Sequence, residues 1–96
     1  MDEKFNKIVK HVQDLGNKLD YLSDNDKLKI YSLFKRATVG KCSEKGGKKP
    51  WKIEFKKRSK WDAWNKLNDM SESDAKEEYI NFINDLLTGT DNEFKE

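Results

Sequence analysis

The sequence predicts an all-α protein of four helices, with one long loop between the second and the third. Apolar residues recur at the helical spacing in four segments, and no segment shows a convincing strand pattern. A chain of 96 residues fits a single domain, residues 1–96. We place its core at about residues 5–87 and expect residues 88–96 to form a polar, frayed tail.

The first helix is predicted over residues 3–15. Gly16 favours a helix end there, because glycine readily adopts the left-handed conformation that closes helices. Residues 17–23 are then expected to form a polar connection. The apolar residues of the helix follow the spacing of one helical face: Phe5, Ile8, Val9, Val12 and Leu15.

The second helix is expected to begin at Ser23 or Asp24, since both residue types cap helix N-termini well, and to end at Gly40. Its apolar residues do not form a single stripe, as a surface helix would require. The segment IYSLFKRATVG at residues 30–40 instead carries two different faces, at about 100° per residue.

One of these faces is suited to the core and the other to a ligand. Ile30, Leu33 and Ala37 gather on the first. Tyr31 and Lys35 lie one turn apart on the second. A ring beside an ammonium group suits a phosphorylated aromatic ligand, because the base stacks on the ring and the cation neutralises phosphate. A half-buried tyrosine beside a solvated lysine is the alternative that spacing alone leaves open.

Residues 41–55 are predicted to form the long loop, since they contain two adjacent glycines and the only proline, Pro50. Loops of this length in compact domains are usually functional or disordered. Trp51, Ile53 and Phe55 alternate along the end of the segment. We expect these three side chains to anchor the loop to the body of the protein.

Two further helices complete the fold. The first covers residues 57–68, and we expect its Trp61 and Trp64 to pack in the core. The second begins after Ser71, where SESD resembles a capping box. Its apolar residues recur with the helical period: Ala75, Tyr79, Phe82, Ile83 and Leu86.

Positive charge is concentrated in one region, although the net charge is only +2. Residues 41–60 contain nine Lys and Arg against two acids, Glu44 and Glu54, so the remainder is net acidic. A local basic patch on a near-neutral protein favours one compact anionic ligand. A merely solvated loop explains the patch about equally well.

Two other classes of binding protein remain open from the charge pattern. A small helical nucleic-acid-binding module could use the basic region, but the first and last helices are too acidic to extend it into a stripe. A peripheral binder of anionic membranes could use the lysines of the loop: Lys45, Lys48, Lys49 and Lys52.

The residues needed for catalysis or metal binding are scarce. His11 is the only histidine, and we expect it to be a solvent-exposed helical residue. Cys42 is the only cysteine, so no internal disulfide can form, which fits a reducing compartment. No pair of these residues has metal-ligand spacing. We therefore expect no enzyme activity, no metal and no cofactor. Because no apolar run approaches the length of a membrane span, a cytoplasmic protein is expected.

Four segments together resemble the acyl-CoA-binding protein family, in the family's order and near its separations. They are FNKIVKHVQDL at 5–15, IYSLFKRATVG at 30–40, KWDAWNKL at 60–67 and SDAKEEYI at 73–80. The resemblance covers about residues 5–87. It implies an up-down-down-up four-helix bundle that binds long-chain fatty acyl-CoA thioesters without catalysis, buffering and transporting them inside the cell as a monomer.

The resemblance also implies a set of site residues. Tyr31 and Lys35 would contact the adenosine-phosphate region of the ligand, Lys60 the 3′-phosphate, and Tyr79 the adenine or ribose. The full set expected around the CoA adenine and phosphates is Tyr31, Phe34, Lys35, Lys56, Lys60 and Tyr79. The set expected along the acyl groove and its rim is Phe5, Val9, Gln13 and Leu28.

Two departures from the family pattern affect this site. Gln13 stands where a basic residue is frequent, and Val9 replaces a smaller residue. Both leave the preferred chain length open. Transient contact with membranes or with acyl-CoA-using enzymes is a further expectation, whereas no nucleic-acid partner is expected.

Overall fold

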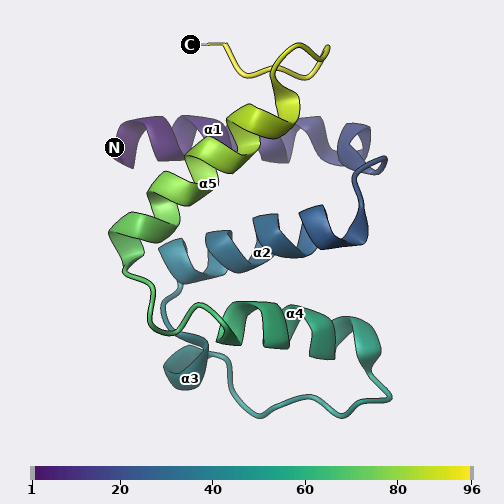
Figure 1. The fold of residues 1–96 in the computed structure, drawn as a ribbon, viewed down its shortest axis with the longest axis vertical. Helices are drawn as coiled ribbons and strands as arrows, with labels where there is room; N and C mark the ends of the chain where they lie inside the picture. The colour runs from purple at the N-terminus through teal and green to yellow at the C-terminus, as the bar shows by residue number, and fades with distance from the viewer. Residues whose placement is uncertain (1, 96) are drawn as a thin grey trace.

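The computed structural model describes residues 2–95 and confirms the predicted all-α fold (Figure 1). In the figure, α1 and α5 run in one direction and α2 and α4 in the other, which gives the up-down-down-up order. No strand is present among the described residues. The elements are α1 (Asp2–Leu15), η1 (Gly16–Leu19), α2 (Asp24–Thr38), α3 (Cys42–Lys45), α4 (Phe55–Asn65) and α5 (Glu72–Leu87).

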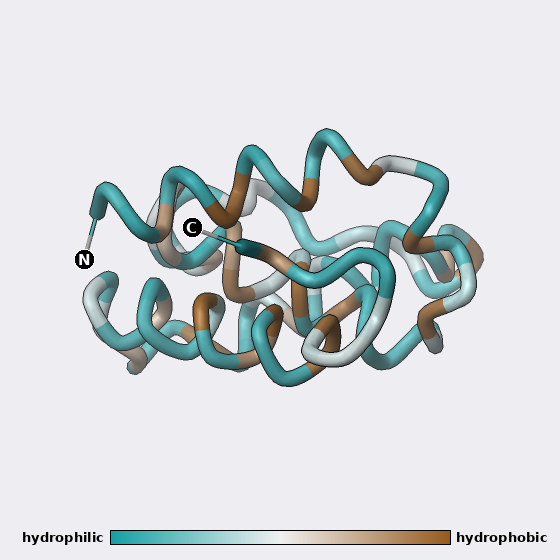
Figure 2. Tube along the Cα trace, turned by 90° about the horizontal axis from the view of Figure 1, so that it is seen from above, coloured by the Kyte–Doolittle hydropathy of each residue, from teal (hydrophilic) through white to brown (hydrophobic). Residues whose placement is uncertain are grey.

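Helix α2 is the central element of the bundle. It packs against α5 and against α4, and α1 packs against α5. The hydrophobic positions of α1 lie on the side that faces the other helices (Figure 2). Burial of these faces is what holds helices of this length together. The core consists of Phe5, Ile8, Leu19, Leu22, Leu33, Ala37, Ala75, Tyr79, Ile80, Ile83 and Leu87.

The predicted helix starts at α2 and α5 are confirmed by their caps. The Ser23 hydroxyl accepts a hydrogen bond of 3.1 Å from the backbone N–H of Asp26. The Ser71 hydroxyl accepts one of 3.0 Å from the N–H of Asp74. Each bond satisfies one of the donors that a helix leaves free at its N-terminus.

The connection between α1 and α2 was expected to be polar, but it contributes apolar side chains to the core. Residues 16–19 form the 3₁₀ helix η1, and Leu19 and Leu22 are both buried in the core. The backbone N–H of Leu22 donates to the Leu19 carbonyl at 3.1 Å, and this turn after η1 brings the two leucines close together.

The C-terminal tail also contacts the body of the protein. The Asn92 carbonyl lies 2.7 Å from Nε2 of His11, which is partly buried. The ring of Phe94 meets the His11 ring edge-on at 5.3 Å and packs against the core. His11 therefore has a structural environment and is not the fully exposed residue that we expected.

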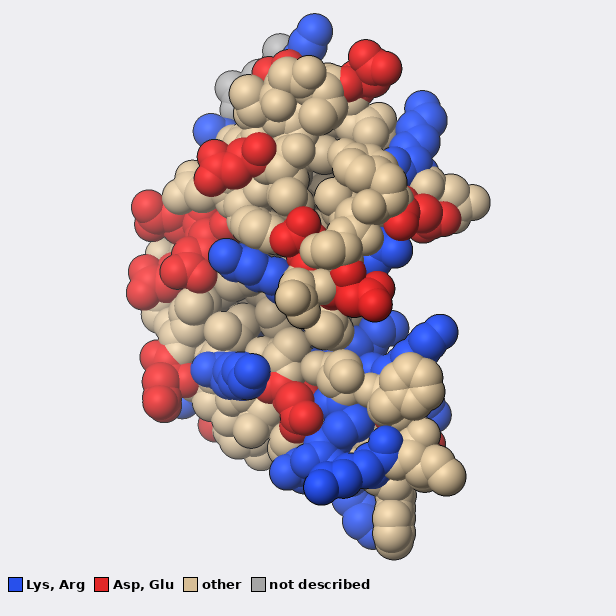
Figure 3. All heavy atoms as spheres, turned by 45° about the vertical axis from the view of Figure 1, so that its right-hand side comes forward, with Lys and Arg blue, Asp and Glu red and all other residues tan. Residues whose placement is uncertain are grey.

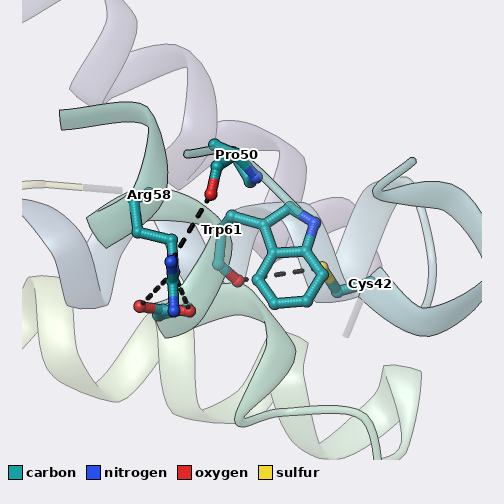
Figure 4. A network of polar contacts seen from close by, with 5 residues as sticks. Cys42, Pro50, Arg58 and Trp61 are labelled. Carbon is teal, nitrogen blue, oxygen red and sulfur yellow. Dashed lines mark hydrogen bonds and ion pairs between the residues drawn. The ribbon is translucent and has the colours of Figure 1, made fainter. Parts of the chain in front are cut away.

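The prediction that three apolar side chains anchor the long loop to the body of the protein is wrong. Trp51, Ile53 and Phe55 are all exposed. The loop is held instead at its start, where α3 forms and the thiol of Cys42 donates to the Trp61 carbonyl at 3.7 Å (Figure 4). Gly46 is required beside it, because a Cβ there would lie 2.5 Å from the Cys42 sulfur.

A second attachment follows at Pro50 (Figure 4). The Arg58 guanidinium donates to the Pro50 carbonyl at 3.5 Å and to the Asp62 carboxylate at 3.1 Å. The fixed points of the loop are thus a carbonyl and a small buried thiol. The chain after Pro50 is free to project from the surface.

Candidate functional site

A pocket of about 260 Å³ lies between α2 and the beginning of α4. The surface in Figure 3 is indented on its right-hand side, above the end where Lys and Arg gather. Three lysines and one aspartate line the pocket, so its charge favours an anionic ligand. The lining residues are Asp24, Lys27, Leu28, Tyr31, Phe55, Lys56, Ser59 and Lys60.

A second pocket of about 270 Å³ lies between α1, α2 and α5. Its lining is more apolar and contains three aromatic rings. Tyr31 and Lys27 belong to both pockets, so the two meet along α2. Its residues are Val9, Val12, Gln13, Lys27, Ile30, Tyr31, Phe34 and Tyr79.

Tyr31 lies at the junction of the two pockets, beside two cations. The ammonium of Lys35 is 5.8 Å from the centre of its ring, and the ammonium of Lys60 is 5.4 Å from it. Both distances lie within the range of cation–π attraction. The ring and the two ammonium groups therefore form one compact group on the α4 side of α2.

Helical spacing explains why these groups meet. Lys27, Tyr31 and Lys35 are four residues apart along α2, so they share one face. Lys56 and Lys60 have the same relation on α4, and this face of α4 is turned toward α2. Two helices that run in the same direction thus present a common cationic surface.

Lys35 is further positioned by a buried tryptophan. Its ammonium lies 5.5 Å from the ring centre of Trp64, which is 5% exposed. The Trp64 indole N–H donates to the Gly40 carbonyl at 2.8 Å, which fixes the ring. The prediction that Trp64 packs in the core is confirmed.

Trp61 is only partly buried, and the Lys49 ammonium lies over its ring at 5.6 Å from the ring centre.

Both tyrosines of the site keep their protons at neutral pH. Burial, with a smaller effect of Cys42, raises the pKa of Tyr31. Burial alone raises the pKa of Tyr79 to about 12. Each phenol is therefore neutral, and a neutral phenol can both donate and accept hydrogen bonds.

The structure places five of the six predicted headgroup residues in the two pockets, whereas Lys35 lines neither of them. Lys56 and Lys60 line the first, Phe34 and Tyr79 line the second, and Tyr31 belongs to both. Tyr79 is only 2% exposed, and its ring packs edge-on against Phe5 at 5.3 Å. The ring of Tyr79 therefore offers little of its surface to a ligand.

The four residues predicted along the acyl groove are not brought together. Leu28 lines the first pocket, whereas Val9 and Gln13 line the second. Phe5 lines neither and is buried in the core.

Sequence reasoning did not assign six of the lining residues to a site, and Asp24 and Val12 are two of them. Lys27 precedes Tyr31 by one turn, so the same i, i+4 spacing that singled out Lys35 could have identified it. Ser59 lies directly before Lys60. Phe55 was expected to be a loop anchor and Ile30 a core residue, yet each contributes to a pocket wall.

Residues 2–95 hold no group of three or more His, Cys, Asp and Glu side chains placed to bind a metal ion. Within the same residues, no helix has the length and apolar character needed to cross a membrane.

The fold and the paired pockets define a small helical ligand-binding domain. Residues 2–83 match the family model described as Acyl CoA binding protein. The chain is 36% identical over 87 residues to the acyl-CoA-binding protein homolog of Drosophila melanogaster, covering 91% of this chain and 94% of that protein.

Two further relatives show comparable similarity. Identity is 37% over 88 residues with acyl-CoA-binding protein homolog 3 of Caenorhabditis elegans, covering 91% of this chain and 73% of that protein. It is 34% over 87 residues with the acyl-CoA-binding protein of Saccharomyces cerevisiae, covering 91% and 93% respectively. The chain therefore belongs to the acyl-CoA-binding protein family, as the four sequence segments indicated.

Proposed function

We propose that this protein binds long-chain fatty acyl-CoA thioesters without catalysis and acts as an intracellular carrier and buffer for them. The observation that carries the proposal is the position of Tyr31, flanked by Lys35 and Lys60 where two pockets meet. Family membership supports the same ligand class. No comparable observation supports a nucleic-acid-binding module.

The headgroup of the ligand fits the group around Tyr31. Adenine is planar and can stack on an aromatic ring, while phosphates attract ammonium groups. The second pocket supplies further aromatic surface from Phe34. The ammonium groups of Lys35 and Lys60 both lie within about 6 Å of the centre of the Tyr31 ring, where they can hold a phosphate attached to the ribose. We accordingly place Val9 and Gln13 beside the headgroup.

The acyl chain fits the first pocket. Leu28 and Phe55 provide apolar surface there, and the methylene stems of Lys56 and Lys60 can cover a chain while their ammonium groups remain in water. Each pocket alone falls slightly below the roughly 300–1,000 Å³ of common ligand sites. An elongated ligand that occupies both, across Tyr31, uses the whole surface.

Head and chain must both contribute to affinity. A sixteen-carbon acyl chain has about fourteen methylenes, and burying them at about 0.8 kcal/mol each gives on the order of 10 kcal/mol before the cost of immobilisation. Free fatty acid has the chain without the head, and CoA has the head without the chain. Both are expected to bind much more weakly than the thioester.

Titration calorimetry with palmitoyl-CoA below its micelle concentration tests this function, with CoA and palmitate as controls. Tight one-to-one binding of the thioester, and weak binding of both controls, is expected. Equal affinity for CoA and palmitoyl-CoA would show that the acyl chain does not contribute to binding. Absence of binding would overturn the proposal. Sedimentation analysis of the same sample, free and loaded, tests the expected monomer.

A further inference from the structure

Three large hydrophobic side chains project into solvent beside the first pocket. Trp51 is 73% exposed, Ile53 is 87% exposed and Phe55 is 68% exposed. Only Tyr21 and Val39 are other exposed large hydrophobics among the described residues. Single exposed apolar residues are common, but three within five positions are not expected without a partner. We call this segment, residues 51–55, the apolar tip.

The tip is attached to α4 at both of its ends. The Arg58 guanidinium holds the Pro50 carbonyl immediately before the tip, and the backbone N–H of Glu54 donates to the Trp51 carbonyl at 3.0 Å. α4 then begins at Phe55. The tip therefore lies beside the beginning of α4, and its three large side chains face solvent there.

Cations surround the tip. Figure 3 shows Lys and Arg gathered at the lower end of the molecule, around uncharged side chains that project outward. Glu54 is the only acid between residues 45 and 61, and its carboxylate lies 3.6 Å from the Lys57 ammonium. The lysines nearest in sequence are Lys48, Lys49, Lys52, Lys56 and Lys57.

We propose that the apolar tip docks onto the surface of anionic phospholipid membranes, with Trp51 and Ile53 inserted among the headgroups and the flanking lysines contacting anionic lipid. Tryptophan favours the boundary between headgroups and acyl chains. Apolar insertion and electrostatic attraction together give reversible binding to such surfaces. The proposal concerns the tip alone and does not depend on the identity of the ligand.

The chemistry of the patch favours lipid over a protein partner. Lysine is depleted at protein–protein interfaces, whereas it is the residue that anionic lipid attracts. The three apolar side chains also protrude, and a protruding apolar group can insert into a bilayer without a matching pocket. Phe55 lines the first pocket as well, so a docked molecule turns the mouth of that pocket toward the membrane.

Co-sedimentation with phosphatidylcholine vesicles, with and without phosphatidylserine, tests the proposal. The unmodified protein should bind the vesicles that contain phosphatidylserine and bind the others much more weakly. Added salt should reduce binding, because it screens the lysines. Binding to neither kind of vesicle would overturn the proposal and leave a protein partner as the explanation of the tip.

Paired variants distinguish specific binding of vesicles by the tip from nonspecific adsorption of the protein. Trp51→Ser with Ile53→Ser should reduce vesicle binding on the order of tenfold or more, whereas Tyr21→Ser with Val39→Ser should leave it unchanged. Lys48→Glu with Lys52→Glu should also reduce it, whereas Lys18→Glu with Lys95→Glu should not. Equal binding by tip and control variants would contradict the proposal.

Palmitoyl-CoA titration in the absence of vesicles distinguishes this proposal from the carrier function. The Trp51/Ile53 variant should keep its affinity for palmitoyl-CoA, because neither residue lines either of the two pockets that meet at Tyr31. Tip-dependent vesicle binding without palmitoyl-CoA binding would uphold docking and overturn the carrier. Palmitoyl-CoA binding without vesicle binding would do the reverse.

Discussion

The two sides of α2 differ in what they pack against. Toward α5, Leu33 and Ala37 are buried in the core. Toward α4, Tyr31 is only partly buried and lies beside two ammonium groups at the junction of two pockets. One helix thus contributes to the core on one side and to the candidate site on the other, which explains why its apolar residues form no single stripe. Substitutions on the two sides should therefore separate stability from affinity.

The largest effect on stability is expected at Trp64, a buried residue that also contacts Lys35 of the candidate site. Trp64→Ala should lower the free energy of unfolding by roughly 3–5 kcal/mol, as truncation of a buried aromatic does. It also leaves the Gly40 carbonyl without its donor. Thermal unfolding measures this effect. Trp51→Ala is the matched control, because Trp51 is exposed and should leave the melting temperature unchanged.

A smaller effect, on affinity alone, is expected at Lys35. Lys35→Ala should weaken palmitoyl-CoA binding by roughly 1.5–3 kcal/mol, or about 10- to 150-fold, if the ammonium makes a charge-assisted contact. The fold should remain intact, because Lys35 does not belong to the hydrophobic core. Calorimetry measures the change, and an unaltered affinity would remove Lys35 from the site.

Lys29 provides the control on the other side of the same helix. Its ammonium lies 4.4 Å from the ring centre of Phe82 in α5. Lys29→Ala should cost about 0.5–1 kcal/mol of stability and leave palmitoyl-CoA affinity unchanged. If Lys29→Ala and Lys35→Ala weakened binding equally, a general charge effect would replace the specific contact.

The sequence predicted the parts of this architecture that depend on local chemistry. The start of α2 at Ser23 and of α5 at Ser71 could be read directly, because a cap involves residues only three apart. Tyr31 and Lys35 could be paired for the same reason. Their neighbour Lys60 comes from another helix, so the resemblance to a family, not the spacing, pointed to it.

Features that depend on distant contacts could not be predicted in the same way. Alternation of Trp51, Ile53 and Phe55 shows that they share a side but not whether the body of the protein faces that side. Leu19 and Phe94 are isolated apolar residues in polar segments, and only the assembled bundle gives each a surface to cover. The division of the groove residues between two pockets likewise follows from how α1 and α4 flank α2.

The cap of α2 supports both of its sides, and its removal should have a moderate effect. Ser23→Ala removes the acceptor for the Asp26 N–H and should cost about 0.5–2 kcal/mol of stability. Denaturant unfolding measures this loss. Ser23→Asp should restore most of it, because aspartate also caps helices well. Failure of the aspartate variant to recover stability would show that the cap is not the cause.

The smallest effect is expected where α1 meets α5 at the surface. The Asp2 carboxylate accepts a hydrogen bond of 2.9 Å from Lys76, which lowers its pKa below the ordinary 3.8. A lowered pKa in the folded state stabilises the protein above pH 3.8, and this contribution disappears as the pH falls through the lowered value. The Asp2 side chain is largely exposed, so the gain is small.

Melting temperatures across the acidic range test this pair. Asp2→Asn should melt slightly below the unmodified protein at pH 5, and the two should converge as the pH approaches 2. The raised pKa of Lys76, caused first by its hydrogen bond to Asp2, corresponds to a stabilisation that is present below pH 10.5 and is lost as the pH rises through the raised value. A difference in melting temperature between the two proteins that grows toward low pH would contradict the lowered pKa of Asp2.

The most direct test of the assignment of α2 is an amide NMR titration of the labelled protein with palmitoyl-CoA. We predict that the large shifts fall on Tyr31 and Lys35 of α2 and on Lys56 and Lys60 of α4, and that Leu33 and Ala37 change little. Large shifts confined to α1 and the C-terminal tail, with the Tyr31 region unaffected, would contradict the account.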